Sequence, residues 1–371
     1  MDPRNMDPLT LRRYGSACLA RDRVLRHSER IVRESLERAV CGHLTPDAGY
    51  DLYAVEAGPL AIGDILGSLR THGLLTRGDT IALAAPIFTP DFDRHYLAHY
   101  GLRAVTIAGH GEGRWQLRDE DLQLLLDGSV KAFFAVDPCN PFGVPLSRQT
   151  IEGIGAVLVK KPSLMLLTDD LFATFVPGFR SLLTSFPANT IGIYSFAKYF
   201  ECSGWRLGVV AVHADNPFDR VIACHPGPPP GPVMTKLCSL AELATHTQPC
   251  HPACADILRR RALAMVQGLA IDVDAHPLFG WSYGLVDFEY WLRQYGGEDA
   301  VDWVMANVHP LDIVVRLAED HGIALLNGTG FEPPDWSVRV PFANVDDEVY
   351  ARIGRAVRAV AREYALTSSF A

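Results

Sequence analysis

The sequence predicts an α/β fold in which a largely parallel sheet is sandwiched between helices and is followed by a smaller α+β domain. Six short apolar runs lack regular polar alternation, which is typical of strands buried on both faces. These runs are Thr80–Phe88, Arg103–Ala108, Val130–Asp137, Ser163–Asp170, Thr190–Ser195 and Leu207–His213. Helix-like segments such as Pro59–Leu75 and Ser147–Val159 lie between several of them. This alternation predicts parallel strands with helices on both sides.

A proline-rich run at residues 225–232 separates this region from the rest of the chain. No helix or central strand could continue through it, because proline lacks a backbone donor and clashes inside helices. Beyond the run we expect, in order, helix, strand, helix, strand and helix at Cys254–Ile271, Ser282–Trp291, Pro310–His321, Trp336–Phe342 and Asp346–Ala365. We therefore predict a large domain of residues 46–245 and a small domain of residues 1–45 and 246–371.

The composition excludes several classes of protein. The 371 residues are 48% apolar and carry a formal net charge of -9, which argues against nucleic acid or an anionic membrane as the main partner. No apolar stretch is long enough for a bilayer span, and the charged N-terminus lacks a signal core, so we expect a cytoplasmic protein. His246, Cys250, His251 and Cys254 lie close together. No second pair at finger spacing follows, so we expect incidental thiols and no metal.

Lys198 is the strongest candidate for chemistry. It follows the predicted strand Thr190–Ser195 directly, and ligands of doubly wound sheets bind beyond the carboxyl ends of the strands. Its aromatic neighbours favour desolvation, which makes a lysine amine competent to form an imine. Ser195 and Arg206 flank it and offer a hydroxyl and a bidentate cation, which suit a phosphate group.

Three further polar residues lie at the ends of predicted strands or inside them. Asn140 lies between two prolines, which hold its side-chain amide in a fixed position. Asp169 ends an apolar strand, where a buried carboxylate is costly unless it meets a cation. Arg339 stands between valines of a strand and needs an anion, for which a substrate carboxylate is suitable.

Together these segments resemble fold-type I enzymes of the aminotransferase class I/II superfamily, which depend on pyridoxal 5′-phosphate (PLP). The resemblance runs from about residue 20 to the end of the chain. Residues 50–58, 168–180, 194–208 and 310–319 are most similar to bacterial L-aspartate 4-decarboxylases. The resemblance implies a mainly parallel seven-stranded sheet, an L-amino acid as substrate, and a homodimer.

The resemblance also implies a role for each motif residue. Lys198 would form the Schiff base with PLP and shuttle protons, and Arg339 would bind the substrate α-carboxylate. Asp169 would keep the pyridine nitrogen protonated, Asn140 would bind the phenolic oxygen, and Phe88 would stack on the ring. Ser195, Arg206 and the backbone at Gly58 would hold the phosphate. The complete set of implied cofactor contacts is Ala57, Gly58, Phe88, Asn140, Asp169, Phe172, Ser195 and Arg206.

Three departures from the family suggest an altered site. Ala57 and Pro59 stand where the family usually offers hydroxyls, so we expect PLP binding weaker by about 1–2 kcal/mol. Phe172 replaces a tyrosine that donates to the ring oxygen, so we expect the imine to stay protonated at neutral pH. No counterpart of the family's long N-terminal arm precedes residues 20–50, which predicts a wider mouth and a bulkier substrate. Arg12 and Arg13 are either substitutes for groups of this arm or solvated basic residues.

These observations predict a PLP-dependent lyase that catalyses β-elimination or decarboxylation at Cα or Cβ of an L-amino acid. We expect a diverged member that uses a bulky or S-conjugated amino acid in natural-product (antibiotic) biosynthesis. The alternative is an aminotransferase or an aspartate 4-decarboxylase. Gly109–Gly113 is superficially similar to the dinucleotide loop of a dehydrogenase, but it lacks a helix-packing glycine and is expected to be a surface turn. A catalytically silent PLP fold with a binding role stays open.

Overall fold

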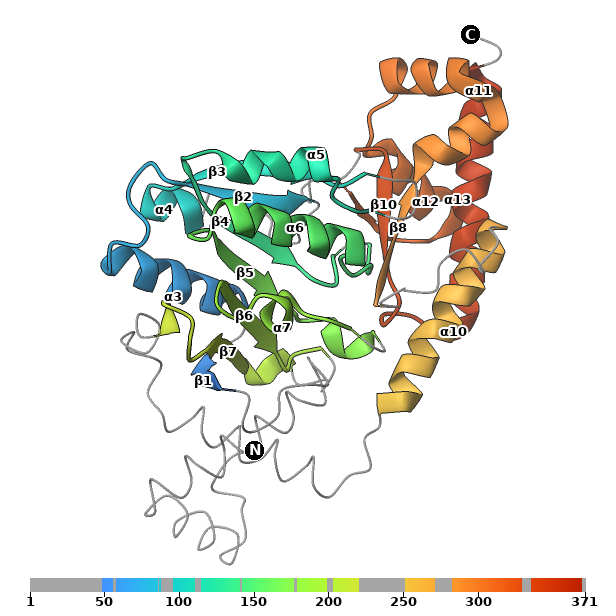
Figure 1. Cartoon of the computed structure of the whole chain (residues 1–371). Helices are drawn as coiled ribbons and strands as arrows, with labels where there is room; N and C mark the ends of the chain where they lie inside the picture. Colours follow the sequence, from blue (N-terminus) through green and yellow to red (C-terminus); the bar gives the residue numbers. More distant parts are fainter. Residues whose placement is uncertain are drawn as a thin grey trace, which may run out of the picture.

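The computed structural model describes residues 49–55, 58–85, 87, 96–110, 115–140, 142–176, 179–198, 203–219, 251–270, 282–328 and 335–368. Figure 1 shows two parts, a larger one built around a central sheet and a smaller one that carries the C-terminal helices. The predicted boundaries between the domains, the proline run at 225–232, and His246 and Cys250 lie outside the described residues. The domain limits therefore remain predictions.

The central sheet has seven described strands in the order β1-β7-β6-β5-β4-β2-β3. Their bounds are Tyr50–Val55 (β1), Thr80–Ala85 (β2), Arg103–Ala108 (β3), Val130–Val136 (β4), Met165–Asp169 (β5), Thr190–Ser195 (β6) and Gly208–His213 (β7). Strand β7 runs antiparallel to both β1 and β6, whereas the β2–β3, β2–β4, β4–β5 and β5–β6 pairs are parallel. The predicted α/β class with a mainly parallel seven-stranded sheet is confirmed.

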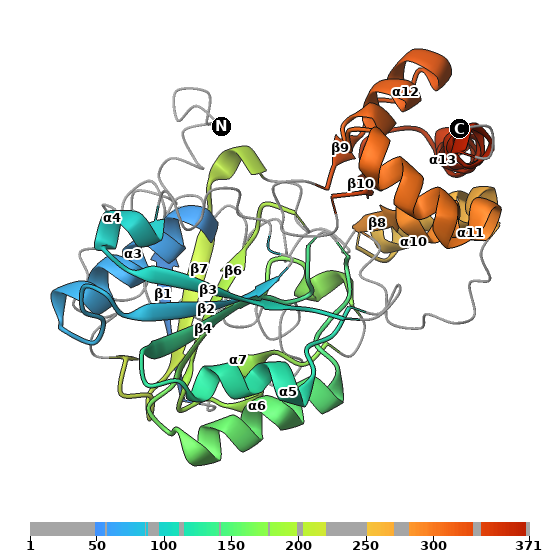
Figure 2. The same ribbon diagram turned by 90° about the horizontal axis from the view of Figure 1, so that it is seen from above.

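Helices cover both faces of this sheet (Figure 2). Alternate residues of β2 separate the two layers: Ile81 and Leu83 pack in the same core as helix α3 (Gly58–Thr71), whereas Ala82 and Ala84 pack with helix α6 (Arg148–Lys160). Shorter helices are α4 (Ala98–Tyr100), α5 (Asp119–Leu122) and α7 (Leu182–Ser185). Burial on both faces explains why the strands have no polar alternation in the sequence.

In the part of the smaller domain that the structure describes, four helices pack around a three-stranded antiparallel sheet in the order β8-β10-β9. The strands are Tyr283–Asp287 (β8), Leu326–Asn327 (β9) and Ser337–Pro341 (β10), and the helices are His251–Leu269 (α10), Phe288–Asn307 (α11), Asp312–His321 (α12) and Asp347–Ser368 (α13). Helices α10 and α13 approach closely at two glycines. A Cβ added to Gly268 would lie 2.3 Å from Ala351 O, and one added to Gly354 would lie 2.4 Å from Met265 O. Neither position has room for a side chain.

The predicted strand at Ser282–Trp291 is correct only in its first half. The strand ends at Asp287, whose side chain accepts a hydrogen bond from Glu289 N at 2.9 Å and caps α11. Phe288, Trp291 and Leu292 then recur at helical spacing and are buried in the core. The aromatic residues that suggested a strand therefore form the inner face of a helix.

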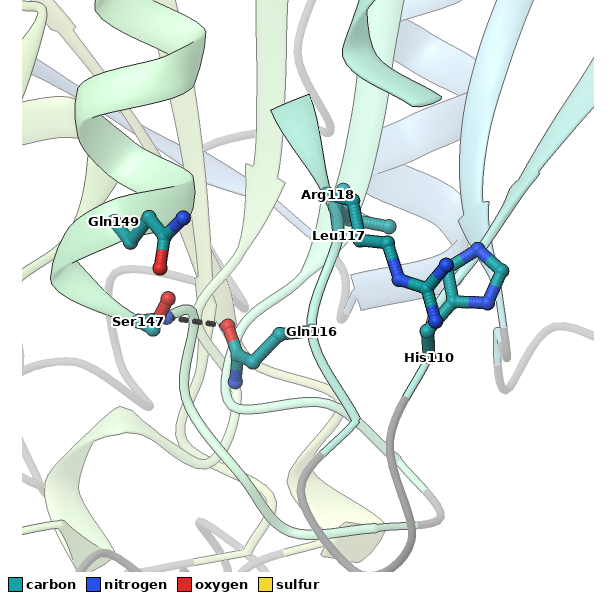
Figure 3. Close-up of a pocket in the computed structure, with 6 residues that line it drawn as sticks. All are labelled: His110, Gln116, Leu117, Arg118, Ser147 and Gln149. Atoms are coloured by element: carbon teal, nitrogen blue, oxygen red, sulfur yellow. Dashed lines mark hydrogen bonds between the residues drawn. The ribbon is translucent and has the colours of Figure 1, made fainter. Parts of the chain in front are cut away.

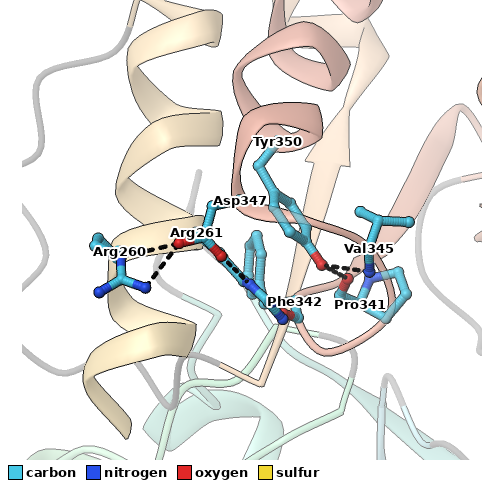
Figure 4. Close-up of polar contacts among 7 residues, drawn as sticks. All are labelled: Arg260, Arg261, Pro341, Phe342, Val345, Asp347 and Tyr350. Carbon is cyan, nitrogen blue, oxygen red and sulfur yellow. Dashed lines mark hydrogen bonds and ion pairs between the residues drawn. The ribbon is translucent and has the colours of Figure 1, made fainter. Parts of the chain in front are cut away.

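Polar contacts fix the end of β10 against α10 and α13 (Figure 4). Asp347, the first residue of α13, pairs with Arg260 at 2.7 Å and with Arg261 at 2.6 Å. Arg261 also donates to Phe342 O at 3.1 Å, and the Tyr350 hydroxyl donates to Pro341 O at 3.1 Å. These bonds hold the strand that carries Arg339. No helix among the described residues is long and apolar enough to cross a membrane, and no metal-binding group of side chains occurs among them.

Candidate active site

The carboxyl ends of β1, β4, β5 and β6 meet at one edge of the sheet. The strand register pairs Val55 with Gly208 and Gly208 with Ser195, so the ends of β1 and β6 flank the start of β7. Asp169, at the end of β5, pairs with Val136 of β4 and Ile193 of β6. Most of the predicted site residues in the described large domain follow these strand ends, as expected for a ligand crevice of an α/β sheet.

One part of this edge suits an anion. Helix α3 begins at Gly58, just beyond the end of β1, and its first N–H groups carry the positive end of the helix dipole. Ser195 ends the next strand but one, and its buried Oγ accepts from Ala197 N at 3.3 Å. Arg206 is exposed and lies just before β7, where Phe196 N donates to Leu207 O at 3.1 Å. The pairing of β1, β7 and β6 therefore brings these three groups to one place.

Asp169 is a buried acid, with a residue exposure of 7%. Burial raises the pKa of its carboxyl to about 7, and a hydrogen bond from Leu171 N to Oδ1 at 3.2 Å offsets only part of this effect. A cation beside the carboxylate would stabilise the charged form and lower that pKa again. Asp169 is therefore suited to a positively charged ligand group.

The neighbouring acid, Asp170, has a structural role. Burial also raises the pKa of its carboxyl to about 7. Its two oxygens accept hydrogen bonds from the hydroxyls of Thr168 at 2.6 Å and Ser181 at 2.5 Å. These contacts tie β5 to the segment that begins α7, and they occupy both oxygens within the protein. The sequence alone does not show which of the two adjacent acids could bind a ligand. The hydrogen bonds to Asp170 leave Asp169 as the candidate.

Asn140 lies in the loop that follows β4. The residue is buried, with 2% exposure, and its Oδ1 has no hydrogen-bond partner among the described residues. The loop is anchored to β5 because Asp137 N donates to Asp169 O at 3.0 Å. Asp137 Oδ1 accepts from Leu146 N at 2.9 Å, and burial raises the pKa of this carboxyl well above its usual value. The side chain of Asn140 is thus buried near the end of β5 with hydrogen-bonding capacity to spare.

Lys198 lies three residues beyond β6, and its side chain is exposed. This differs from the desolvated amine that its aromatic neighbours suggest. The reason is that Phe196 is fully buried and packs edge-to-face on Tyr194, with ring centroids 5.3 Å apart. That ring therefore belongs to the core of the large domain. The exposed position leaves the Lys198 amine accessible to a ligand.

The smaller domain contributes Arg339, which is 7% exposed and lies in the middle of β10. Its guanidinium carbon lies 4.5 Å from the centroid of the Tyr283 ring on β8. Tyr283 in turn contacts Phe172 edge-to-face, with centroids 5.4 Å apart. Phe172 follows Asp169 by three residues and is buried in the core of the smaller domain. Arg339 is therefore linked to the segment that follows Asp169 through two aromatic side chains, Tyr283 and Phe172.

Two predicted cofactor contacts, Ala57 and Phe88, lie outside the described residues. A separate hollow of about 340 Å³ lies beside the N-terminus of α6 (Figure 3). Its lining contains none of the predicted site residues: it consists of His110, Gln116, Leu117, Arg118, Ser147 and Gln149. His110 pairs with Gln116 as an isolated β-bridge, which fits the turn expected at 109–113, although residues 111–114 are not described.

A family model described as "Aminotransferase class I and II" matches residues 68–357. The chain belongs to this family. It is 33% identical to a "Bifunctional aspartate aminotransferase and L-aspartate beta-decarboxylase" of Pseudomonas sp, over 92% of this chain and 72% of that one. It is 24% identical to an aspartate aminotransferase of Geobacillus stearothermophilus, over 76% of this chain and 70% of the relative.

Solved structures share the fold. An aromatic aminotransferase of Pyrococcus horikoshii OT3 superposes with a TM-score of 0.71 at 18% identity, covering 97% of this chain and 94% of that one. An alanine aminotransferase of Pyrococcus furiosus gives a TM-score of 0.69 at 18% identity, covering 91% and 81%. These likenesses confirm the fold-type I architecture.

The family uses PLP, and the described residues fit this cofactor. Burial raises the pKa of Asp169, and the cation of a protonated pyridine nitrogen would stabilise the charged form of this carboxyl. Asn140 lies in the loop tied to the end of β5, and its side-chain NH2 is the group that would donate to a ring oxygen. The anion-binding corner formed by α3, Ser195 and Arg206 matches a phosphate. The chain is a PLP-dependent enzyme of the aminotransferase family, as the sequence predicts.

Proposed function

We propose that this enzyme acts on L-aspartate or a closely related L-amino acid, as an aminotransferase, as a β-decarboxylase, or as both. The observation that carries the proposal is the buried Arg339, since a guanidinium at 7% exposure beside the large-domain site suits a substrate carboxylate. The similarity to a bifunctional aspartate aminotransferase and decarboxylase over 92% of the chain supports this choice of substrate. This similarity favours the aminotransferase or aspartate 4-decarboxylase, the alternative predicted from the sequence, over a lyase for a bulky substrate.

In this proposal each site residue binds, orients or moves a proton. Arg339 holds the α-carboxylate, while Asp169 keeps the cofactor's pyridine nitrogen protonated and Asn140 donates to its phenolic oxygen. When bound, PLP supplies an electron sink for the bond that breaks at Cα. The amine of Lys198 anchors the cofactor and then removes and returns the proton at the substrate's Cα.

The phosphate in this proposal is held by three groups that approach from different strands. They are the N-terminus of α3 at Gly58, the hydroxyl of Ser195, and the guanidinium of Arg206. Arg206 has φ +48°, an uncommon value for a residue other than glycine, asparagine or aspartate. Ala57 and Phe88 complete the proposed contacts from segments outside the described residues.

A second candidate is β-elimination from a bulkier or S-substituted amino acid of the kind used in natural-product pathways. One observation favours it: Phe172 presents a ring without a hydroxyl, and it packs against Tyr283. Without a donor at this position, PLP bound at Lys198 would lack one hydrogen bond to its ring oxygen, so the visible absorbance of the loaded enzyme should titrate above neutral pH. A midpoint well below pH 7 would remove this support.

The quaternary structure is also part of the proposal. Fold-type I enzymes build their sites beside a second subunit, so we expect a homodimer. Sedimentation equilibrium of the PLP-loaded protein should give twice the monomer mass of 40.8 kDa. A monomer that retains full activity would contradict this expectation.

The activity test is a panel of L-amino acids and S-substituted cysteines, supplied with PLP and with 2-oxoglutarate present or absent. We expect L-aspartate to give oxaloacetate and glutamate when 2-oxoglutarate is present, or alanine and CO2 without it. Pyruvate and ammonia from an S-substituted cysteine, with aspartate untouched, would favour the second candidate. Failure to convert any amino acid would overturn the proposed function.

A further inference from the structure

Tyr283 lies directly beside the arginine that is proposed to bind substrate. Strands β8 and β10 pair Arg339 with Leu285 and Pro341 with Tyr283, so Tyr283 and Arg339 are diagonal neighbours on one face of the sheet. The Arg339 guanidinium carbon is 4.5 Å from the ring centroid. This distance is within the range of a cation–π interaction.

Tyr283 also contacts Phe172, a residue that follows β5 of the large domain. Its ring meets the ring of Phe172 at an interplanar angle of 84°, with centroids 5.4 Å apart, which is a favourable edge-to-face geometry. Phe172 is placed by β5, whose last residue is Asp169. Tyr283 therefore connects the carboxylate-binding arginine with the strand end that is proposed to hold the cofactor's pyridine ring.

The ring also compensates for the burial of the guanidinium. Burial lowers the pKa of Arg339 from its ordinary value, because the charged guanidinium loses water. Arginine remains charged even so, and the electron-rich face of an aromatic ring stabilises a cation that has lost water.

We propose that Tyr283 is a positioning residue for the substrate carboxylate. Its ring holds the Arg339 guanidinium in place, and contact with Phe172 fixes the position of the ring. This inference rests on the proposed function, in which Arg339 binds the α-carboxylate. It makes the ring, and not the phenolic hydroxyl, the part of Tyr283 that matters for binding.

The test is a double-mutant cycle in the PLP-loaded enzyme. The variants are Tyr283→Leu, Tyr283→Phe, Arg339→Leu and the combination of Tyr283→Leu with Arg339→Leu. The readouts are the Kd of the unreactive dicarboxylate maleate by calorimetry, and KM and kcat for the amino acid identified by the panel. The visible absorbance of the bound cofactor checks that each variant is folded and loaded. If Tyr283→Leu does not fold, Tyr283→Met replaces it.

We expect Tyr283→Leu to raise the Kd of maleate and the KM by about tenfold, which lies between the values for an exposed and a desolvated cation–π contact, with a much smaller change in kcat. Tyr283→Phe should stay within about twofold of the wild type, since it keeps the ring. In the Arg339→Leu background the Tyr283→Leu change should have no further effect, because the two residues act as a unit.

Different failures point to different errors. If Arg339→Leu leaves both maleate binding and KM unchanged, the proposed role of Arg339 is wrong and the inference fails with it. If the wild type does not bind maleate, the KM values alone decide between the outcomes. If Arg339→Leu weakens binding but Tyr283→Leu does not, only the inference about Tyr283 is wrong. Equal losses in Tyr283→Leu and Tyr283→Phe would assign the effect to the hydroxyl and overturn the role of the ring.

Discussion

The substitution Asp169→Asn should have opposite effects in the cofactor-free and the cofactor-loaded protein. Asp169 is buried, and burial raises the pKa of its carboxyl from the usual 3.8 to about 7. In the folded protein without a cation at this site, ionisation of the carboxyl therefore lowers the free energy of unfolding. An amide does not ionise and avoids this loss. Asparagine keeps an oxygen that can accept the hydrogen bond from Leu171 N.

The magnitude follows from the two pKa values. Below pH 3.8 the carboxyl is protonated in both states and its burial costs no ionisation energy. As the pH rises from 3.8 to about 7 the unfolded chain ionises first, so stability is lost over this window. The full difference corresponds to about 4 kcal/mol in the free energy of unfolding at pH 8. The advantage of Asp169→Asn over the wild type should therefore grow by about 3 kcal/mol between pH 5 and pH 8.

Urea denaturation of the PLP-free proteins at pH 5 and pH 8 measures this difference. Asp299→Asn, which changes an exposed carboxyl on α11, is the matched control. With PLP added the wild type should have the advantage. We expect Asp169→Asn to bind PLP at least about tenfold more weakly, since a neutral amide cannot form an ion pair with a protonated pyridine nitrogen. Identical pH profiles for Asp169→Asn and the wild type, or unchanged PLP affinity, would refute the reasoning.

Three further substitutions test other parts of the structure. Asp347→Asn should lower the melting temperature at pH 7, and the loss should shrink as the pH falls below about 3.8, because hydrogen bonds from two arginines of α10 hold the pKa of this carboxyl below its usual value. Gly354→Ala should destabilise the fold by about 1–3 kcal/mol in urea denaturation, since the new Cβ would meet backbone atoms of α10. Gly128→Ala is the control and should not destabilise the fold, because the space around Gly128 is open. Equal effects of the two substitutions would contradict the close helix packing. Arg206→Leu should weaken PLP binding by about tenfold in a fluorescence titration, and Arg148→Leu on the exposed face of α6 should leave it unchanged; unaltered affinity in Arg206→Leu would remove this residue from the phosphate site.

The sheet could be predicted from the sequence because its strands are buried on both faces. The bounds of β3 and β6 agree with the predicted Arg103–Ala108 and Thr190–Ser195. The prediction failed at Phe288–Trp291, where apolar aromatic residues suit either a strand or a helix. Asp287 decides the matter as a helix cap, and this signal was present in the sequence.

The positions of candidate residues were predictable where each lies at or just after the end of a strand, as for Asp169, Ser195 and Lys198. Their surroundings were not predictable, because these come from distant segments. Asp170 accepts a hydrogen bond from Ser181, eleven residues away, and the Arg339 guanidinium lies over the ring of Tyr283, 56 residues away. Neither contact leaves a local pattern, so the sequence revealed the charged groups but not their neighbours.

The attachment of the cofactor to Lys198 is the claim on which the proposed chemistry depends, and a single measurement tests it. The PLP-loaded enzyme is reduced with borohydride, digested, and mapped by mass spectrometry for the pyridoxyl group. We predict the label on the peptide that contains Lys198, and loss of the visible imine band in Lys198→Ala. A label on any of the other four lysines (131, 160, 161 or 236), or an unchanged imine band in Lys198→Ala, would contradict the proposed site.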